Sequence, residues 1–405
     1  MKKIALPKDV SYILQTLNQH GFEAYIVGGC VRDSLLGIAP KDWDITTSAK
    51  PEETKKLFTH TFDTGIQHGT ITVVRNHENY EITTYRIEGE YEDCRRPDYV
   101  EFTSDLKEDL LRRDFTMNAI AYHPEEGFQD PFSGQMDIQN KTIRGVGEPA
   151  KRFQEDALRM LRCIRFGVQL GFVVEPETKV ALSENVALIQ KISVERIKDE
   201  LEKTWISTHM ESLPLLWESG LLEQVDGYLC QKVLENPNLL EQLQKAPKHP
   251  HFRWALVLQN YDQKALKSIC KGLKFDNDGT KVISTMALLS QQDLPTKPYE
   301  MRQLLSKYGD IVDKIITLQE ILRPESTFST SRTVYETILA DGDCLTLKQL
   351  EVDGQALMDM GIPKGKQIGQ MLNHLLDLVH QNPEWNTKEQ LEQIVTAVGE
   401  DIILP

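Results

Sequence analysis

A pair of glycines followed by a pair of aspartates is the strongest chemical signal in the sequence. The first segment reads Gly28-Gly29-Cys30-Val31-Arg32-Asp33, and Asp42-Trp43-Asp44 follows it. Glycines after a strand let the backbone approach a ligand closely and leave N–H groups free at the start of a helix, an arrangement that suits a triphosphate. Arg32, in the first turn after the glycines, would add a positive charge beside the same phosphates.

The two aspartates have the spacing of a metal site. Asp42 and Asp44 are two residues apart on a predicted strand, so both carboxylates would leave the same face. Paired oxygen ligands suit Mg²⁺, and two such ions about 4 Å apart can activate an attacking hydroxyl and neutralise a leaving pyrophosphate. Taken singly, a double glycine is usually a turn, and an Asp-x-Asp pair is usually a solvated edge or a helix cap. Their combination in this order favours a nucleotide site with Mg²⁺ bound by Asp42 and Asp44.

A third carboxylate often completes such a site from a neighbouring strand. Glu81 fits this role because it is the polar residue within the β-rich run Tyr80-Glu81-Ile82-Thr83-Thr84-Tyr85. The alternative is an ordinary exposed strand residue, and both interpretations stay open at this stage.

A second constellation lies on a predicted helix. Asp156 and Arg159 are three residues apart, which makes them neighbours on one helix surface. An aspartate can accept from the exocyclic amine that cytosine and adenine share, and an arginine can donate to ring acceptors, so the pair could select a base. Uracil and guanine carry a carbonyl in place of that amine. A solvated salt bridge between the two side chains is the structural alternative, and the residues alone do not decide between them.

The remaining polar segments have structural explanations. Arg112-Arg113-Asp114-Phe115-Thr116-Met117-Asn118-Ala119 is typical of a helix start with its basic residues facing outward. Asp130-Pro131-Phe132-Ser133-Gly134, with Arg144 after it, predicts a turn and a later strand end.

The elements that would position these side chains change in type along the chain. Alternating apolar residues predict short strands at 25–27, 43–46, 69–74 and 80–86, with a turn at 76–79 between the last two. From about residue 151 apolar residues recur every three or four positions, which predicts one helix through 153–168 and mostly helices to the end. Residues 323–333 have the composition of a linker. The pattern predicts an α/β or α+β head followed by a mostly helical remainder.

Composition limits the class of protein. The net charge is −15, but residues 141–165 hold seven basic residues against three acidic ones, so a local basic surface compatible with RNA exists. Six scattered cysteines without a CxxC pair suit free thiols in a reducing compartment. No apolar run is long enough for a membrane span, and the N-terminus does not read as a signal peptide. We expect a cytoplasmic protein without a membrane partner, and the oligomeric state stays open, a homodimer included.

Five elements together resemble the class II CCA-adding enzymes of the poly(A) polymerase-related nucleotidyltransferase family. They are Gly28-Gly29-x-Val-Arg-Asp with Asp42-x-Asp44, Arg112-Arg113-Asp114, Asp130 to Arg144, Glu155-Asp156-x-x-Arg159, and Ser193-Val194-Glu195-Arg196-Ile197. The resemblance spans residues 22–200. It implies template-independent addition and repair of the 3′-terminal CCA of tRNA from CTP and ATP, with release of pyrophosphate.

The resemblance also implies an organisation and roles for single residues. It implies an α+β fold with a small mixed β-sheet in a nucleotidyltransferase head at 1–150. Helices would form a neck that selects the nucleotide at 151–210, a body at 211–325 and a tRNA-binding tail at 326–405. Asp42 and Asp44 would bind Mg²⁺, Gly29 and Arg32 would hold the triphosphate, and Asp156 with Arg159 would act as an amino-acid template. Glu81, to which the resemblance assigns no role, would assist deprotonation of the attacking hydroxyl. Arg113, Arg162 and Arg165 would support nucleotide binding, although Arg165 points away from Asp156 on an ideal helix.

Related activities remain as alternatives. The same family contains CC-adding enzymes, A-adding enzymes and bacterial poly(A) polymerases, and a non-catalytic nucleotide or RNA sensor is a further class. Residues 86–99 resemble the mobile head loop of CCA-adding and A-adding members, which CC-adding members shorten. The segment from Leu350 through Gly369, with Lys364 and Lys366 at a predicted helix start, resembles the part that grips the tRNA elbow.

Overall fold

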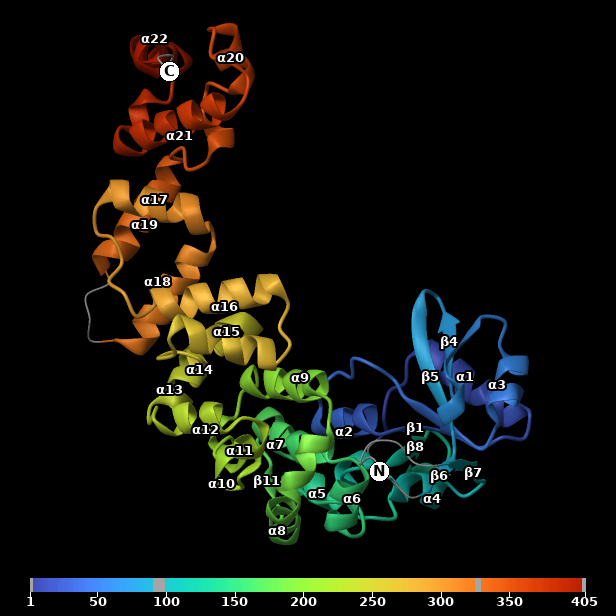
Figure 1. Cartoon of the computed structure of the whole chain (residues 1–405). Helices are drawn as coiled ribbons and strands as arrows, with labels where there is room; N and C mark the ends of the chain where they lie inside the picture. Colours follow the sequence, from blue (N-terminus) through green and yellow to red (C-terminus); the bar gives the residue numbers. More distant parts are fainter. Residues whose placement is uncertain (1–2, 90–98, 325–328, 403–405) are drawn as a thin grey trace. The chain divides into compact units, whose positions relative to one another are not determined.

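The computed structural model describes residues 3–89, 99–324 and 329–402. The chain divides into two compact units (Figure 1). The first unit comprises Met1–Gln244 with Gly272–Lys274, and the second comprises Lys245–Lys271 with Phe275–Pro405. All the catalytic and nucleotide-binding candidates from the sequence fall in the first unit.

A mixed sheet of seven strands, in the order β3-β4-β5-β2-β1-β8-β9, forms the core of the N-terminal part. Strands β2 and β5 are parallel and the other neighbours are antiparallel. The strands are β1 Ala24–Val27, β2 Ile45–Thr47, β3 Thr61–Gly65, β4 Thr70–Arg75, β5 Glu78–Thr84, β8 Ala121–His123 and β9 Gly127–Gln129. Two short pairs lie outside it, β6 Arg86–Glu88 with β7 Val100–Phe102 and β10 Thr142–Ile143 with β11 Val173–Val174.

The β4–β5 hairpin confirms the turn predicted from the sequence. Asn76 and His77 both have positive φ, as the two central residues of a tight hairpin turn require. Along β5 the side chains alternate, so that Tyr80 and Ile82 are buried whereas Glu81 is exposed. Helices α1 and α3 lie beside this hairpin (Figure 1).

The helices that precede residue 246 include one that begins at the double glycine. Gly28 has φ 80°, a conformation that favours glycine, and Gly29 opens α2. Arg112 ends a helix rather than starting one, so that prediction is wrong. The helices are α1 Lys8–Gln19, α2 Gly29–Leu36, α3 Pro51–Leu57, α4 Leu106–Leu111, α5 Gly134–Gln139, α6 Pro149–Glu155, α7 Leu158–Leu170, α8 Pro176–Asn185, α9 Val194–Trp205, α10 Leu215–Glu218, α11 Leu221–Val225, α12 Gly227–Leu234 and α13 Leu239–Lys245.

The predicted continuous helix through 153–168 is broken. Helix α6 ends at Glu155 and α7 begins at Leu158, with Asp156 in an extended conformation between them. The Asp156 carboxylate accepts a hydrogen bond from the backbone N–H of Leu158 at 3.1 Å. Such a local side-chain bond competes with the helical ladder, and this explains why an apolar period that runs through the break did not reveal it.

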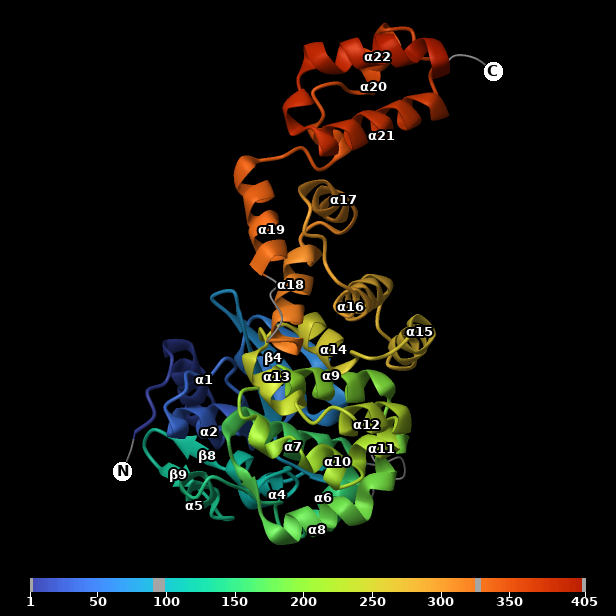
Figure 2. The ribbon, with the colours of Figure 1, turned by 90° about the vertical axis from the view of Figure 1, so that its left-hand side faces the viewer.

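The described part of the second unit is built from helices (Figures 1 and 2). One apolar core of this unit gathers Leu357, Met371, Leu375 and Leu391. No helix in the described ranges is both long and apolar enough to cross a bilayer. The helices are α14 Pro250–Val257, α15 Gln263–Gly272, α16 Asn277–Leu289, α17 Pro298–Tyr308, α18 Ile311–Leu322, α19 Ser329–Asp341, α20 Gly354–Asp359, α21 Lys366–Gln381 and α22 Lys388–Ile402.

Candidate functional site

Asp44 and the glycine turn meet at one end of the central strands. The backbone N–H of Val27, the last residue of β1, donates to the carbonyl of Asp44 at 3.0 Å, and Gly28 follows directly. Strand β2 begins only at Ile45, so Asp42 and Asp44 precede the strand instead of lying on it as predicted. The pairing with β1 nevertheless fixes Asp44 beside the glycine turn.

Glu81 lies next to Asp44 across the parallel pair of strands. Ile45 on β2 is in register with Ile82 on β5, which brings the residues just before them, Asp44 and Glu81, to the same level. Protein atoms around Asp44 raise the pKa of its carboxyl, Arg113 opposes this rise, and the charges of Glu81 and Asp42 add to it. Asp44 is exposed to solvent, but protein atoms surround it closely because it lies in a cleft. The three carboxylates therefore form one electrostatic group.

A cavity of about 490 Å³ opens over this end of the sheet. It brings together the glycine turn, Asp44 and the residues around the α6–α7 break. Seven arginines and three aspartates line it, which gives an excess of positive charge suited to a polyanion. The lining residues are Gly28, Gly29, Arg32, Asp44, Arg112, Arg113, Asp114, Asn118, Asp156, Leu158, Arg159, Arg162, Arg165, Phe166 and Arg196.

Phe166 organises three of the arginines. The guanidinium carbons of Arg32, Arg162 and Arg165 lie 5.0, 5.3 and 4.1 Å from the centroid of its ring. Cation–π contacts of this kind hold a guanidinium in place without neutralising its charge. No sequence signal points to Phe166, because an aromatic residue on a buried helix face cannot be distinguished from a core residue.

Arg32 is buried and held by two partners. Its Nη1 donates to the side chain of Asn118 at 2.7 Å, and its Nε donates to Asp33 at 2.8 Å. The sequence gives only a structural explanation for Asn118, whereas in the structure this residue lines the cavity and accepts from Arg32.

Asp114 anchors the opposite wall. Its Oδ2 accepts two hydrogen bonds from Arg162, at 2.6 and 2.9 Å, while Oδ1 accepts from Asn118. Burial acts to raise the pKa of this carboxyl, but the Arg162 charge and the Asn118 hydrogen bond outweigh burial and hold the pKa well below its usual range. Asp114 therefore stays ionised and keeps Arg162 oriented toward the cavity.

Replacing Asp114 by alanine is expected to lower the free energy of unfolding of the first unit by about 3 kcal/mol, because it leaves its buried partners unpaired. The lowered pKa makes the contribution of Asp114 complete above the unfolded-chain value of about 3.9 and progressively lost as the pH falls below it. Urea denaturation at pH 7 and pH 3 measures both effects. The difference in free energy of unfolding between wild type and Asp114→Ala should be smaller at pH 3 than at pH 7. The control Lys55→Ala removes the exposed Lys55–Asp63 pair and should cost less than about 1 kcal/mol. Equal decreases in the free energy of unfolding for Asp114→Ala and Lys55→Ala would contradict the anchoring role of Asp114.

Asp156 and Arg159 both reach the cavity, but each has its own partner. Asp156 Oδ2 pairs with Arg196 of α9 at 2.9 Å, and Arg159 pairs with Glu155 at 2.7 Å. Arg159 also donates to the carbonyl of Arg112 at 2.8 Å. The described ion pairs include none between Asp156 and Arg159, so the salt-bridge alternative is wrong. Both side chains are instead fixed separately at the edge of the cavity.

Arg165 lines the cavity while its charge is largely engaged elsewhere. Its Nε donates to Glu200 of α9 at 2.6 Å and its Nη1 to Gln169 at 2.7 Å. Burial lowers the pKa of the guanidinium, and the Glu200 carboxylate counteracts the shift. A direct contact of Arg165 with a nucleotide stays a prediction.

Two buried donors in the cavity point to a missing acceptor. Nε of Arg113 and Nη1 of Arg196 have no hydrogen-bond partner in the part of the chain that the structure describes. A buried donor without a partner is costly, and an acceptor group of a bound ligand would lower this cost. Arg113 also lies over the glycine turn, where its Nη1 would be 3.2 Å from a Cβ at Gly28.

The acidic group suits a hard cation by its chemistry. Asp42 and Glu81 do not line the cavity but influence the pKa of Asp44, which does. Within residues 3–89, 99–324 and 329–402, no group of three or more His, Cys, Asp or Glu side chains is arranged to hold a metal ion. A metal would therefore depend first on the carboxylates of Asp42 and Asp44, which are ligands typical of Mg²⁺.

Two other sequence interpretations concern segments outside this cavity. Helix α21 begins at Lys366 as predicted, and Lys364 and Lys366 are both exposed. Of the predicted head loop at 86–99, residues 90–98 lie outside the described residues.

Comparisons with known proteins support one family. A profile described as a poly(A) polymerase head domain matches residues 24–144, one described as a probable RNA- and SrmB-binding site of polymerase A matches 171–226, and one described as a putative tRNA nucleotidyltransferase domain 2 matches 249–395. A CCA-adding enzyme of Lactobacillus helveticus is 39% identical over 391 residues, 94% of either chain. The chain belongs to the CCA-adding enzyme family.

Other CCA-adding enzymes agree in sequence and fold. One from a Geobacillus species is 39% identical over 94% of either chain. The crystal structure of the Bacillus stearothermophilus CCA-adding enzyme superimposes with a TM-score of 0.81 at 32% identity, covering 97% of this chain and 98% of the other. The predicted α+β class, with a mixed-sheet head and a largely helical remainder, is confirmed for this CCA-adding family member.

Proposed function

We propose that the chain adds and repairs the 3′-terminal CCA of tRNA, using CTP and ATP without a nucleic-acid template and releasing pyrophosphate. Its relatives are CCA-adding enzymes, and the structure of the Bacillus stearothermophilus relative is a complex with CTP. The observation that carries the proposal is the single cavity that joins Asp44 and the glycine turn to Asp156 and Arg159. One end can hold a triphosphate and the other end can select a base.

The phosphate end uses charge and backbone donors. We propose that the N–H groups after Gly28, together with Arg32 and Arg113, bind the triphosphate, and that Arg162 and Arg165 add to the positive field. Asp42 and Asp44 would hold Mg²⁺, with Glu81 beside them. When bound, Mg²⁺ lowers the cost of negative charge on the attacking 3′-oxygen and on the leaving pyrophosphate.

The base end uses the fixed Asp156 and Arg159. A carboxylate has about four acceptor positions, so Asp156 can accept from a base while it stays paired with Arg196. Cytosine and adenine offer an exocyclic amine to Asp156, whereas uracil and guanine present a carbonyl that would face its negative charge. Arg159 would donate to a ring acceptor of the same base. The Asp156–Arg196 pair thus pre-orients the acceptor before a nucleotide binds.

The rest of the chain is proposed to handle the RNA. We propose a head at 1–150, a neck at 151–210, a body at 211–325 and a tail at 326–405. Lys364 and Lys366, exposed at the start of α21, would contact phosphates of the tRNA elbow. Such an enzyme would work where tRNA matures, and we propose a cytoplasmic location.

An end-sequencing assay tests the activity. The full chain is incubated with Mg²⁺, CTP and ATP and with tRNAs that end before or within CCA, and the RNA ends are sequenced. We expect each tRNA to be completed to CCA and elongation to stop there. Long adenosine tails would instead favour a poly(A) polymerase, and a lack of incorporation would favour a sensor on the same fold.

A further inference from the structure

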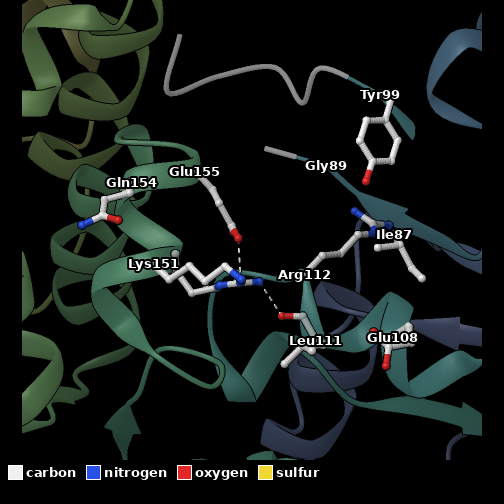
Figure 3. Close-up of a pocket in the computed structure, with 10 residues that line it drawn as sticks. Ile87, Gly89, Tyr99, Glu108, Leu111, Arg112, Lys151, Gln154 and Glu155 are labelled. Carbon is white, nitrogen blue, oxygen red and sulfur yellow. Dashed lines mark hydrogen bonds and ion pairs between the residues drawn. The ribbon is translucent and has the colours of Figure 1, made fainter. Parts of the chain in front are cut away.

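A second cavity lies on the other side of Arg112. It measures about 530 Å³, is lined within the first unit by residues that include Ile87, Gly89, Tyr99, Leu111 and Lys151, and reaches Gln154 and Glu155 of α6 (Figure 3). This volume falls within the range of small-ligand sites and is large enough for a nucleotide. Nothing in the roles proposed so far uses it.

The wall beside the end of β6 is an exposed aromatic surface. The Tyr99 side chain is 60% exposed and Ile87 is 37% exposed, an unusual display for large apolar side chains. Gly89 permits this placement, because a Cβ there would lie 2.5 Å from the Tyr99 ring. The backbone N–H of Gly89 also donates to the Tyr99 carbonyl at 3.0 Å. An exposed, positioned aromatic face is what base stacking on a single strand requires.

The facing wall supplies a cation. Lys151, in the first turn of α6, is exposed and forms no ion pair among the described residues. In Figure 3 it lies across the cavity from Tyr99, near Gln154. An aromatic platform with a neighbouring lysine matches the combination of stacking and backbone charge that single-stranded nucleic acids bind.

The two cavities are neighbours that share Arg112 as a lining residue. Arg112 lines both, and its carbonyl accepts from Arg159, the proposed base reader, at 2.8 Å. Glu155 lines the second cavity and pairs with the same Arg159 at 2.7 Å. A base in the second cavity would therefore be adjacent to the nucleotide that Asp156 and Arg159 select.

On this geometry, and resting on the proposed function, we propose that the second cavity binds a nucleobase of the single-stranded 3′ end of the RNA substrate. Tyr99 stacks on the base and Lys151 lies beside a phosphate of the same strand. This site positions the acceptor strand, whereas the first cavity binds the incoming nucleotide.

The test separates binding of RNA from binding of nucleotide. Tyr99→Ala should raise the Kd for tRNA that ends at the second C of CCA by about 10-fold, the effect of losing one stacked base, and leave KM for ATP unchanged. Tyr99→Phe keeps the aromatic face and should retain wild-type affinity. Phe62→Ala removes a side chain that is 62% exposed on β3 and should change neither constant. Lys151→Ala should reduce the salt dependence of log Kd by about 0.7, the share of one phosphate contact on a single strand.

A direct probe keeps the proposal falsifiable with the wild-type protein. 2-Aminopurine near the 3′ end of the tRNA should lose fluorescence on binding to wild type and Tyr99→Phe, but not on binding to Tyr99→Ala. An unchanged tRNA affinity of Tyr99→Ala, or a rise in KM for ATP instead, would overturn the assignment. Because CCA addition by the wild-type chain is measured separately, such a result would leave the proposed function intact.

Discussion

Asp42→Ala is expected to lower kcat for CTP incorporation into tRNA by about 1,000-fold or more. On the proposed function, a metal held by Asp42 would contribute several kcal/mol to the stabilisation of charge in the transition state, and each 1.36 kcal/mol is a factor of ten in rate. Because Asp42 is exposed, Asp42→Ala should fold normally. Its charge also raises the pKa of Asp44, and the variant removes that effect. Single-turnover incorporation of labelled CTP at saturating tRNA measures the effect.

Three controls connect this loss to the metal. The Tm and the Kd for tRNA should match those of the wild type, and Asp63→Ala, which removes an exposed aspartate on β3, should retain full activity. Asp42→Asn should need more Mg²⁺ for half-maximal rate, because an amide oxygen is a weaker ligand than a carboxylate. Turnover within tenfold of the wild type for Asp42→Ala would refute the assignment.

The second large effect concerns the choice of base. Asp156→Ala is expected to reduce the preference for CTP over UTP by about 10- to 150-fold, the equivalent of 1.5–3 kcal/mol for a hydrogen bond to a charged group. Removing the carboxylate removes both the acceptor for the amine and the repulsion of a carbonyl. The ratio of kcat/KM for CTP to that for UTP, measured with one tRNA, tests this directly.

The Asp156–Arg196 pair offers a second variant for the same question. Arg196→Ala leaves the carboxylate in place but removes the partner that orients it at 2.9 Å, so selectivity should fall in the same direction and by less. The guanidinium of Arg165 is paired with Glu200. Arg165→Ala therefore serves as a comparison and should change base preference least of the three variants. An unchanged CTP preference in Asp156→Ala would remove this residue from base selection.

Much of the head followed from local sequence patterns. The β4–β5 hairpin and the glycine turn before α2 depend on residues close together in the chain, and the sequence predicted both. For Glu81 the sequence left a metal-site carboxylate and an exposed strand residue open. The predictions that failed concern helix boundaries, where a side chain forms a hydrogen bond with a nearby backbone N–H. The Asp156 carboxylate binds the N–H of Leu158 and interrupts a helix that the apolar period alone would continue. Arg112 likewise ends α4, which begins earlier than expected because the backbone N–H of Lys107 donates to the N-cap carboxylate of Asp105.

The sequence by itself therefore determined the fold class and the set of residues proposed to carry the chemistry, because the spacing of glycines, carboxylates and arginines can be read within short segments. Only the tertiary structure decided their partners. Asp114 meets Arg162, and Asp156 meets Arg196, across 48 and 40 residues of chain. These pairs exist because α7 packs against α9 and against the loop after α4, and no periodicity in one segment specifies which charge of another will face it. The same packing placed Phe166 among three arginines and left a second cavity behind Arg112.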